Sequence, residues 1–190
     1  MNVEDGWLRK VGQRPPWSIE MSAAIEEALG ADSEIYRKGL VSLSQGYGLG
    51  ACAYLRRVVE NNVHRILALL HDLNRELGAS AEELKELQQI IDSRTADKKL
   101  AEASKFLPPS LIVDGANPLR LLYDGLSQGI HSMTDDECAD TAAQMVVALE
   151  HLVTELDHQL TARHHFAEEI RKLAAKRRGL QARSAPDRQS

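Results

Sequence analysis

The sequence predicts an all-α protein, a single helical bundle with a long C-terminal helix. Apolar residues recur at 3.6-residue spacing through residues 51–77, and a heptad-like apolar stripe runs from Cys138 to Leu173. No segment alternates apolar and polar residues with a period of two, as a half-buried strand does. A chain of 190 residues can form one domain with a core and is too short to expect two. We therefore expect an irregular N-terminal arm over 1–17, a single helical domain over 18–175 and a basic disordered tail over 176–190.

The first half of the domain is expected to hold three helices. They span about 18–29, closed by Gly30, then 33–43, and then 51–77, closed by Gly78. Between the last two, Gly46, Gly48 and Gly50 stand at alternate positions. Glycine inside a helix costs about 1 kcal/mol relative to alanine. This segment is therefore either a helix break or a place where two helices approach closely, and the sequence leaves both alternatives open.

Helix N-terminal capping motifs predict where the helices begin in the second half of the domain. The capping box from Ser80 to Glu83 opens a helix whose Leu and Ile residues point inward. A polar stretch then leads to an extended connection at Pro108-Pro109. Asn117-Pro118 begins another helix, expected to end near His131, and a second capping box from Thr134 to Glu137 opens the long C-terminal helix.

Composition excludes several functional classes. The net charge of −5 argues against broad electrostatic capture of nucleic acid. The two cysteines have neither zinc-site spacing nor the density of a disulfide framework. Neither a signal-peptide core nor an apolar run of about 18 residues is found, so we expect a cytoplasmic protein without a membrane segment. Phosphate-loop, HExxH and nucleophile-elbow motifs are missing as well, and we predict neither a cofactor nor a metal.

Histidines provide the first candidate sites. His151, His158 and His165 repeat every seven residues, about 10 Å apart along a helix, which is too far for one metal ion within one chain. We interpret them as a solvated stripe, with a metal site shared across a dimer as the lesser alternative. His131 lies at a helix end near Gly125 and Gly129. A histidine there is favoured electrostatically when protonated, and it could equally act as an acid or base beside a ligand.

The segment LRRVVENNVHRIL adds further candidates. Arg56 and Glu60 are spaced for an i,i+4 ion pair at the edge of the apolar stripe. Arg57 and His64 fall on the opposite, exposed face, two turns apart. Asn62 falls inside the apolar face and needs a hydrogen-bond partner if it is buried.

Two stretches, GYGLGACAYLRRVVE and NPLRLLYDGLSQGIHSMTDDEC, resemble a group of bacterial proteins similar to the HEPN superfamily. The resemblance covers about residues 33–175. It implies a small helical bundle that forms a homodimer, in a superfamily whose members occur in toxin–antitoxin and antiphage defence systems. Active members are metal-independent ribonucleases with an Arg, four to six residues and then a His.

This chain departs from that signature. No Arg stands at the required distance before His131, and the spacing is met only by Arg57 and His64, in an earlier helix than the family's motif. The resemblance therefore implies the fold and the dimer more than it implies nuclease activity. A composite catalytic site of Arg56, Arg57 and Glu60 with His131 is the alternative that the sequence leaves open.

We rank a dimeric helical module that binds a protein partner, RNA or a nucleotide first. A metal-independent ribonuclease is second, with His131 as general acid–base and Arg56 or Arg57 stabilising the charged transition state. A purely structural helical scaffold is third. Enzyme activity is thus left undecided, with the weight against it.

Overall fold

The computed structural model describes residues 3–4, 7–8, 19–93, 95–128 and 130–183, and it confirms the all-α prediction. A pair of two-residue strands, β1 (Val3–Glu4) and β2 (Trp7–Leu8), pairs antiparallel near the N-terminus. All other regular elements described are helical. The α-helices are α1 (Ala23–Leu29), α2 (Ser33–Ser44), α3 (Gly48–Leu77), α4 (Ala81–Ile91), α5 (Ala96–Ala103), α6 (Pro118–Ser127) and α7 (Asp135–Arg183).

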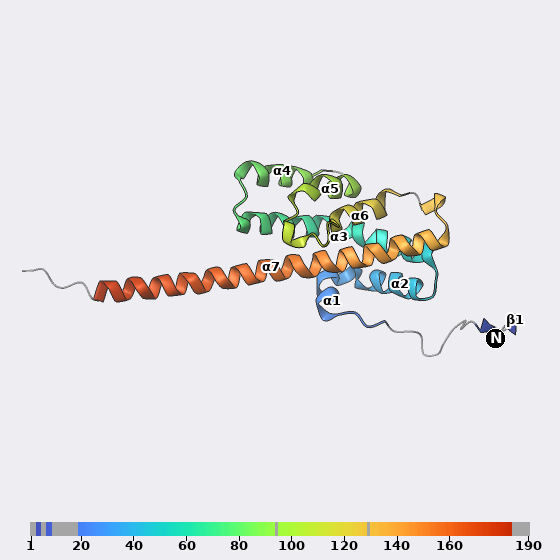
Figure 1. Cartoon of the computed structure of the whole chain (residues 1–190), viewed down its shortest axis with the longest axis horizontal. Coiled ribbons are helices and arrows are strands. Elements are labelled where there is room, and N and C mark those ends of the chain that lie inside the picture. The colour runs from blue at the N-terminus through green and yellow to red at the C-terminus, as the bar shows by residue number, and fades with distance from the viewer. Residues whose placement is uncertain (1–2, 5–6, 9–18, 94, 129, 184–190) are drawn as a thin grey trace, which may run out of the picture.

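Helix α3 and the first half of α7 form the centre of the bundle. Figure 1 shows α1 and α2 on one side of α7 and α4, α5 and α6 on the other. The core consists of aliphatic side chains with few aromatic ones, as the composition indicates, and it includes the fully buried Leu55, Leu67, Leu119, Leu122 and Leu152. Beyond the bundle, α7 continues as a single projecting helix (Figure 1). None of the described helices is both long and apolar enough to cross a membrane.

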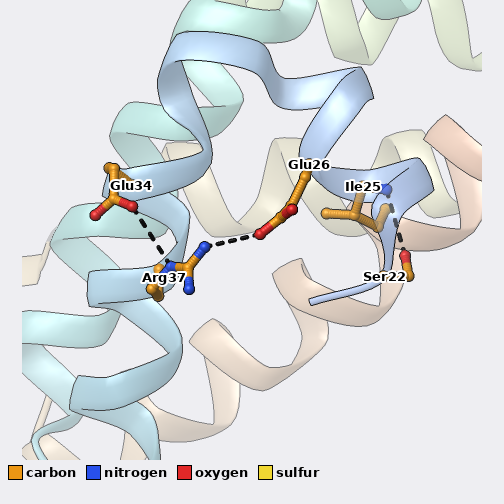
Figure 2. Close-up of polar contacts among 5 residues, drawn as sticks. All are labelled: Ser22, Ile25, Glu26, Glu34 and Arg37. Carbon is orange, nitrogen blue, oxygen red and sulfur yellow. Dashed lines mark hydrogen bonds and ion pairs between the residues drawn. The ribbon is translucent and has the colours of Figure 1, made fainter. Parts of the chain in front are cut away.

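Polar contacts fix α1 and α2. The Ser22 hydroxyl accepts a hydrogen bond from the Ile25 N–H at 3.3 Å and so begins α1 at Ala23, whereas 19–22 are not helical. The predicted start at residue 18 lies outside the described residues. Arg37 on α2 donates to Glu26 of α1 at 2.8 Å and lies 3.6 Å from Glu34 on its own helix, as Figure 2 shows.

Tyr36 joins α2 to α7. Its side chain is fully buried, and its hydroxyl donates a 2.6 Å hydrogen bond to the Glu150 carboxylate. Burial, followed by the hydrogen bond and the charge of Glu150, raises the pKa of Tyr36 far above its ordinary value. The phenol is therefore a permanent donor, which holds Glu150 against the bundle.

The glycine segment combines both predicted alternatives. Gly46 has a φ of +75° in the turn between α2 and α3, a conformation that favours glycine. Gly48 lies against α7, where a Cβ atom would meet the Asp135 carbonyl oxygen at 1.9 Å. Gly50 has room, because its Cβ would meet Ser42 at 3.6 Å and Tyr47 at 4.0 Å, both ordinary contact distances. One glycine breaks the helix and another permits close packing.

The predicted caps are confirmed. Gly78 closes α3 in the left-handed conformation, and Asn117 accepts hydrogen bonds from the Leu119 and Arg120 N–H groups at the start of α6. Ser80 with Glu83 and Thr134 with Glu137 form reciprocal side-chain-to-backbone hydrogen bonds. These bonds lower the pKa of both glutamates. Local sequence signals thus set these helix ends.

Three predicted boundaries were wrong. The polar stretch before Leu100 is helical from Ala96 onward, in α5, whose Leu100 and Ala103 are buried against the bundle. Helix α6 ends at Ser127, not near His131, because Gln128 is extended. Helix α7 runs to Arg183, so residues 176–183 of the predicted disordered tail are helical, whereas 184–190 lie outside the described residues.

Candidate functional site

Arg56 is part of the corner where α6 ends. Its Nη1 donates hydrogen bonds to the carbonyl oxygens of Gly125, at 3.0 Å, and Gln128, at 2.7 Å. Both carbonyls belong to the C-terminal end of α6. The last carbonyl groups of a helix have no N–H partner within the helix, and the negative end of the helix dipole lies there. The predicted ion pair with Glu60 is not formed, because this guanidinium binds α6 instead. Arg56 is thus a tertiary helix cap.

A second contact closes the same corner from α7. The Asp135 carboxylate accepts a 2.8 Å hydrogen bond from the backbone N–H of Leu49, in the first turn of α3. An acidic side chain at a helix N-terminus is favourable, because the first N–H groups are unpaired there. This contact and the close approach at Gly48 fix the start of α7 on the start of α3. No local pattern signals this pairing, because the two residues are 86 positions apart along the chain.

His131 lies on the exposed side of this corner. It is in the short 3-10 turn Ile130–Ser132, between α6 and α7, and its side chain is exposed. In the part of the chain that the structure describes, it makes no hydrogen bond or ion pair. It lies within a 3-10 turn and not in the last turn of an α-helix, so the helix-dipole explanation of its position does not apply.

The other predicted site residues lie on α3. Arg57 and His64 are exposed, as the helical periodicity indicated, and Glu60, which was expected at the edge of the apolar stripe, is exposed as well. Arg56 differs from Arg57 because its guanidinium is occupied by two carbonyl oxygens. The composite site of Arg56, Arg57 and Glu60 with His131 remains a prediction: Arg56 reaches the corner that precedes His131, and no described contact joins these side chains to His131.

Asn62 has the partner that its buried position requires. Its side-chain amide donates to the Asp32 carboxylate at 3.0 Å and to the Val58 carbonyl at 2.9 Å. The neighbouring Asn61 donates to the other Asp32 oxygen at 2.8 Å. These bonds attach the turn between α1 and α2 to α3, which is a structural function.

The three regularly spaced histidines have different surroundings. His151 is half-buried, and its Nε2 lies 3.1 Å from the Leu111 carbonyl oxygen. His158 and His165 are exposed. Among the described residues, no group of three or more His, Cys, Asp or Glu side chains is arranged to hold a metal ion.

A cleft of about 330 Å³ lies between α1, α3 and α7. Its lining includes the ionisable residues Glu27, Arg65, Asp157 and His158, the polar residues Asn62, Thr154 and Thr161, and several aliphatic side chains. Because both acidic and basic groups line it, its charge selects neither an anion nor a cation. The sequence did not indicate this cleft, because its walls come from three helices that are distant along the chain.

The two cysteines meet where α3 crosses α7. Cys52 and Cys138 are both fully buried and are free thiols. Burial raises the pKa of Cys52, and a hydrogen-bonding contact with the Cys138 thiol raises it further. The Cys52 thiol is therefore held in its protonated form, and both thiols are shielded from solvent.

The apolar stripe on α7 is buried within the bundle and exposed beyond it. Cys138, Ala142, Met145, Leu149, Leu152 and Leu156 are buried, as the heptad pattern predicted. The same pattern continues beyond the bundle, where Phe166, Ile170 and Leu173 are 67%, 48% and 62% exposed. The last contacts of α7 with α3 are those of Arg163 and His164 with Glu76. We call residues 165–183 the α7 overhang; Figure 1 shows it extending away from every other helix.

Comparison with known proteins yields no match to a family model, a curated protein or a solved structure. The resemblance to the HEPN superfamily therefore remains an expectation from the sequence.

Proposed function

We propose that the protein is a helical interaction module that self-associates through the α7 overhang. The observation that carries the proposal is the exposed stripe of Phe166, Ile170 and Leu173. These three residues repeat at intervals of four and three, the spacing by which two helices pack together. The same spacing packs the first half of α7 into its own bundle. A second copy of the chain is the partner that supplies an equivalent stripe.

The free energy gained by burying this stripe can be compared with the free-energy cost of association, and the comparison fits a reversible dimer. Burying one Leu, Ile or Phe side chain contributes about 1.5–3 kcal/mol. A dimer would bury three such side chains from each copy, whereas association costs about 4–15 kcal/mol in lost freedom. The two ranges overlap, so we expect a weak dimer whose population depends on the protein concentration. Among the described residues, nothing buries Phe166, Ile170 or Leu173 within one chain.

The test is light scattering coupled to size-exclusion chromatography over a concentration series. Wild-type protein should shift from monomer to dimer as concentration rises, and Leu173→Glu should stay monomeric, because it places a charge in the apolar contact. Glu155→Gln, in the part of α7 that belongs to the bundle, is the control and should dimerise like wild type. A wild-type protein that is monomeric at every concentration would reject self-association and favour the purely structural scaffold.

A metal-independent ribonuclease is the second candidate function. The observation in its favour is that Arg57 and His64, at the HEPN-like spacing, are both exposed on one face of α3, and that His131 is exposed at the corner capped by Arg56. The protein would be incubated with total cellular RNA in EDTA beside His131→Ala and His64→Ala. Cleavage lost in His131→Ala would support the composite site, and cleavage lost in His64→Ala would support the α3 pair. No cleavage by wild type would leave the interaction module as the sole activity proposed for the isolated protein.

A further inference from the structure

The charges along the α7 overhang are segregated. Glu168 and Glu169 lie near its start, and Lys176 and Arg177 lie further along, with all four side chains exposed. Lys172 already forms ion pairs with Glu168, at 3.0 Å, and with Glu169, at 2.9 Å. Within the described part of the chain, Lys176 and Arg177 form no ion pair. The acidic and basic ends of the overhang are therefore suited to a partner whose charges run in the opposite direction.

The apolar stripe defines a heptad register, and the direction of a second copy decides which seam residues face each other. Ile170 and Arg177 occupy one seam position, and Phe166 and Leu173 occupy the other. A parallel, in-register pair would place each seam residue beside its own copy, so Arg177 would face Arg177. Like charges in contact destabilise an interface. A parallel dimer would therefore have a repulsive pair in its apolar seam.

An antiparallel pair resolves this conflict. If Ile170 packs on Leu173 of the second copy, the same register brings Arg177 to the aromatic ring of Phe166, where a guanidinium is attracted to the ring face. Glu169, beside the seam, then lies near Lys176 of the second copy. On the other edge, Ala167 lies near Ala174, and small side chains there allow the two helices to approach closely.

We propose that the partner of the α7 overhang is a second copy of this chain lying antiparallel, centred between Ile170 and Leu173. This inference rests on the proposed self-association and specifies its direction. It places the two bundles at opposite ends of a shared pair of helices. Each bundle then keeps its corner at His131 and its α3 face exposed.

Disulfide trapping tests the direction. Ile170→Cys and Leu173→Cys proteins of different mass, made distinguishable by a tag, are oxidised mildly alone and as a mixture. The antiparallel pair predicts a covalent product that joins Ile170→Cys to Leu173→Cys in the mixture, with little product from either alone. Wild type is the control and should give no covalent dimer, because Cys52 and Cys138 are buried. Covalent dimers from each variant alone would overturn the antiparallel direction in favour of a parallel one.

Charge exchange is the second measurement, and light scattering separates the two proposals. Glu169→Lys and Lys176→Glu should each weaken the dimer severalfold, and the double variant should recover it, because the exchanged charges face each other again only in the antiparallel pair. Failure of the double variant to recover, while wild type dimerises, would overturn the direction and keep self-association. A wild type that stays monomeric would overturn both.

Discussion

The guanidinium of Arg56 binds two carbonyl oxygens that α6 leaves unpaired at its C-terminal end. In the sequence, Arg56 and Arg57 are adjacent and equally suited to a charged site. In the fold, one is turned towards α6 and the other towards solvent. Helical periodicity predicted which of the two lies at the edge of the apolar stripe. It could not predict the carbonyls, because they belong to a helix about 70 residues further along the chain.

Replacing Arg56 with methionine should reduce stability. Met keeps most of the apolar stem and removes the donors, so the Gly125 and Gln128 carbonyls lose their protein partner. We expect a loss of about 1–3 kcal/mol in the free energy of unfolding, measured by urea denaturation. The adjacent Arg57→Met is the control and should change it by less than about 0.5 kcal/mol, because that side chain is exposed. Equal effects of the two substitutions would contradict the capping role of Arg56.

Helices α3 and α7 approach each other closely at Gly48. The approach is accompanied by the Asp135 hydrogen bond to Leu49 and by the buried contact of Cys52 with Cys138 one turn further on. The sequence indicated the glycine cluster and offered two explanations for it. Only the packing of the two helices assigns one explanation to Gly46 and the other to Gly48, because a Cβ atom is excluded by backbone atoms of a different helix.

Alanine substitutions at Gly48 and Gly50 should distinguish a glycine required by close packing from one that has room for a side chain. Gly48→Ala places a Cβ 1.9 Å from the Asp135 carbonyl oxygen and 2.6 Å from the Ala139 nitrogen, so the two backbones must move apart. We expect a loss of about 1–3 kcal/mol in the free energy of unfolding. Gly50→Ala is the matched control in the same helix. It should raise stability by up to about 1 kcal/mol, because its Cβ meets only ordinary contacts and alanine favours the helix. Thermal unfolding monitored by circular dichroism measures both, and a stabilising Gly48→Ala would reject the close approach.

At the scale of the whole molecule, the chain divides into a packed bundle and a projecting helix. The bundle is held by contacts between distant helices, whereas in the described part of the chain the α7 overhang is held by its own backbone hydrogen bonds and local ion pairs. An isolated helix of about 19 residues is marginal in water, because tertiary packing supplies most helical stability. The overhang should therefore open locally far more often than the bundle unless a second copy covers it.

Limited proteolysis with trypsin should reveal this difference. At concentrations well below the dissociation constant, cleavage should begin after Arg171, Lys172, Lys176 or Arg177 and leave the bundle intact. At concentrations well above it, the same sites should be protected by the second copy. Leu173→Glu is the control and should be cleaved at one rate at both concentrations. Mass spectrometry of the fragments identifies the sites, and first cleavage within α3 would contradict this division of stability.

Local signals determined most of the secondary structure of this protein. The caps at Ser80, Asn117 and Thr134, the glycine at the end of α3 and the apolar periodicity of α3 and α7 act over one or two turns, so they can be recognised without the fold. The same locality explains the errors. Helix α5 is polar on most of its surface and is recognisable only from the side chains it buries, and the end of α6 depends on a corner closed by Arg56 from another helix.

The sequence by itself also determined that a heptad stripe continues along α7 as far as Leu173. Only the tertiary structure decided where along that stripe the bundle ends, and so which residues are core and which are free for a partner. The physical reason is that periodicity records which face of a helix is apolar, whereas burial depends on which other helices reach that face. At Leu156 they do, and at Phe166 they do not.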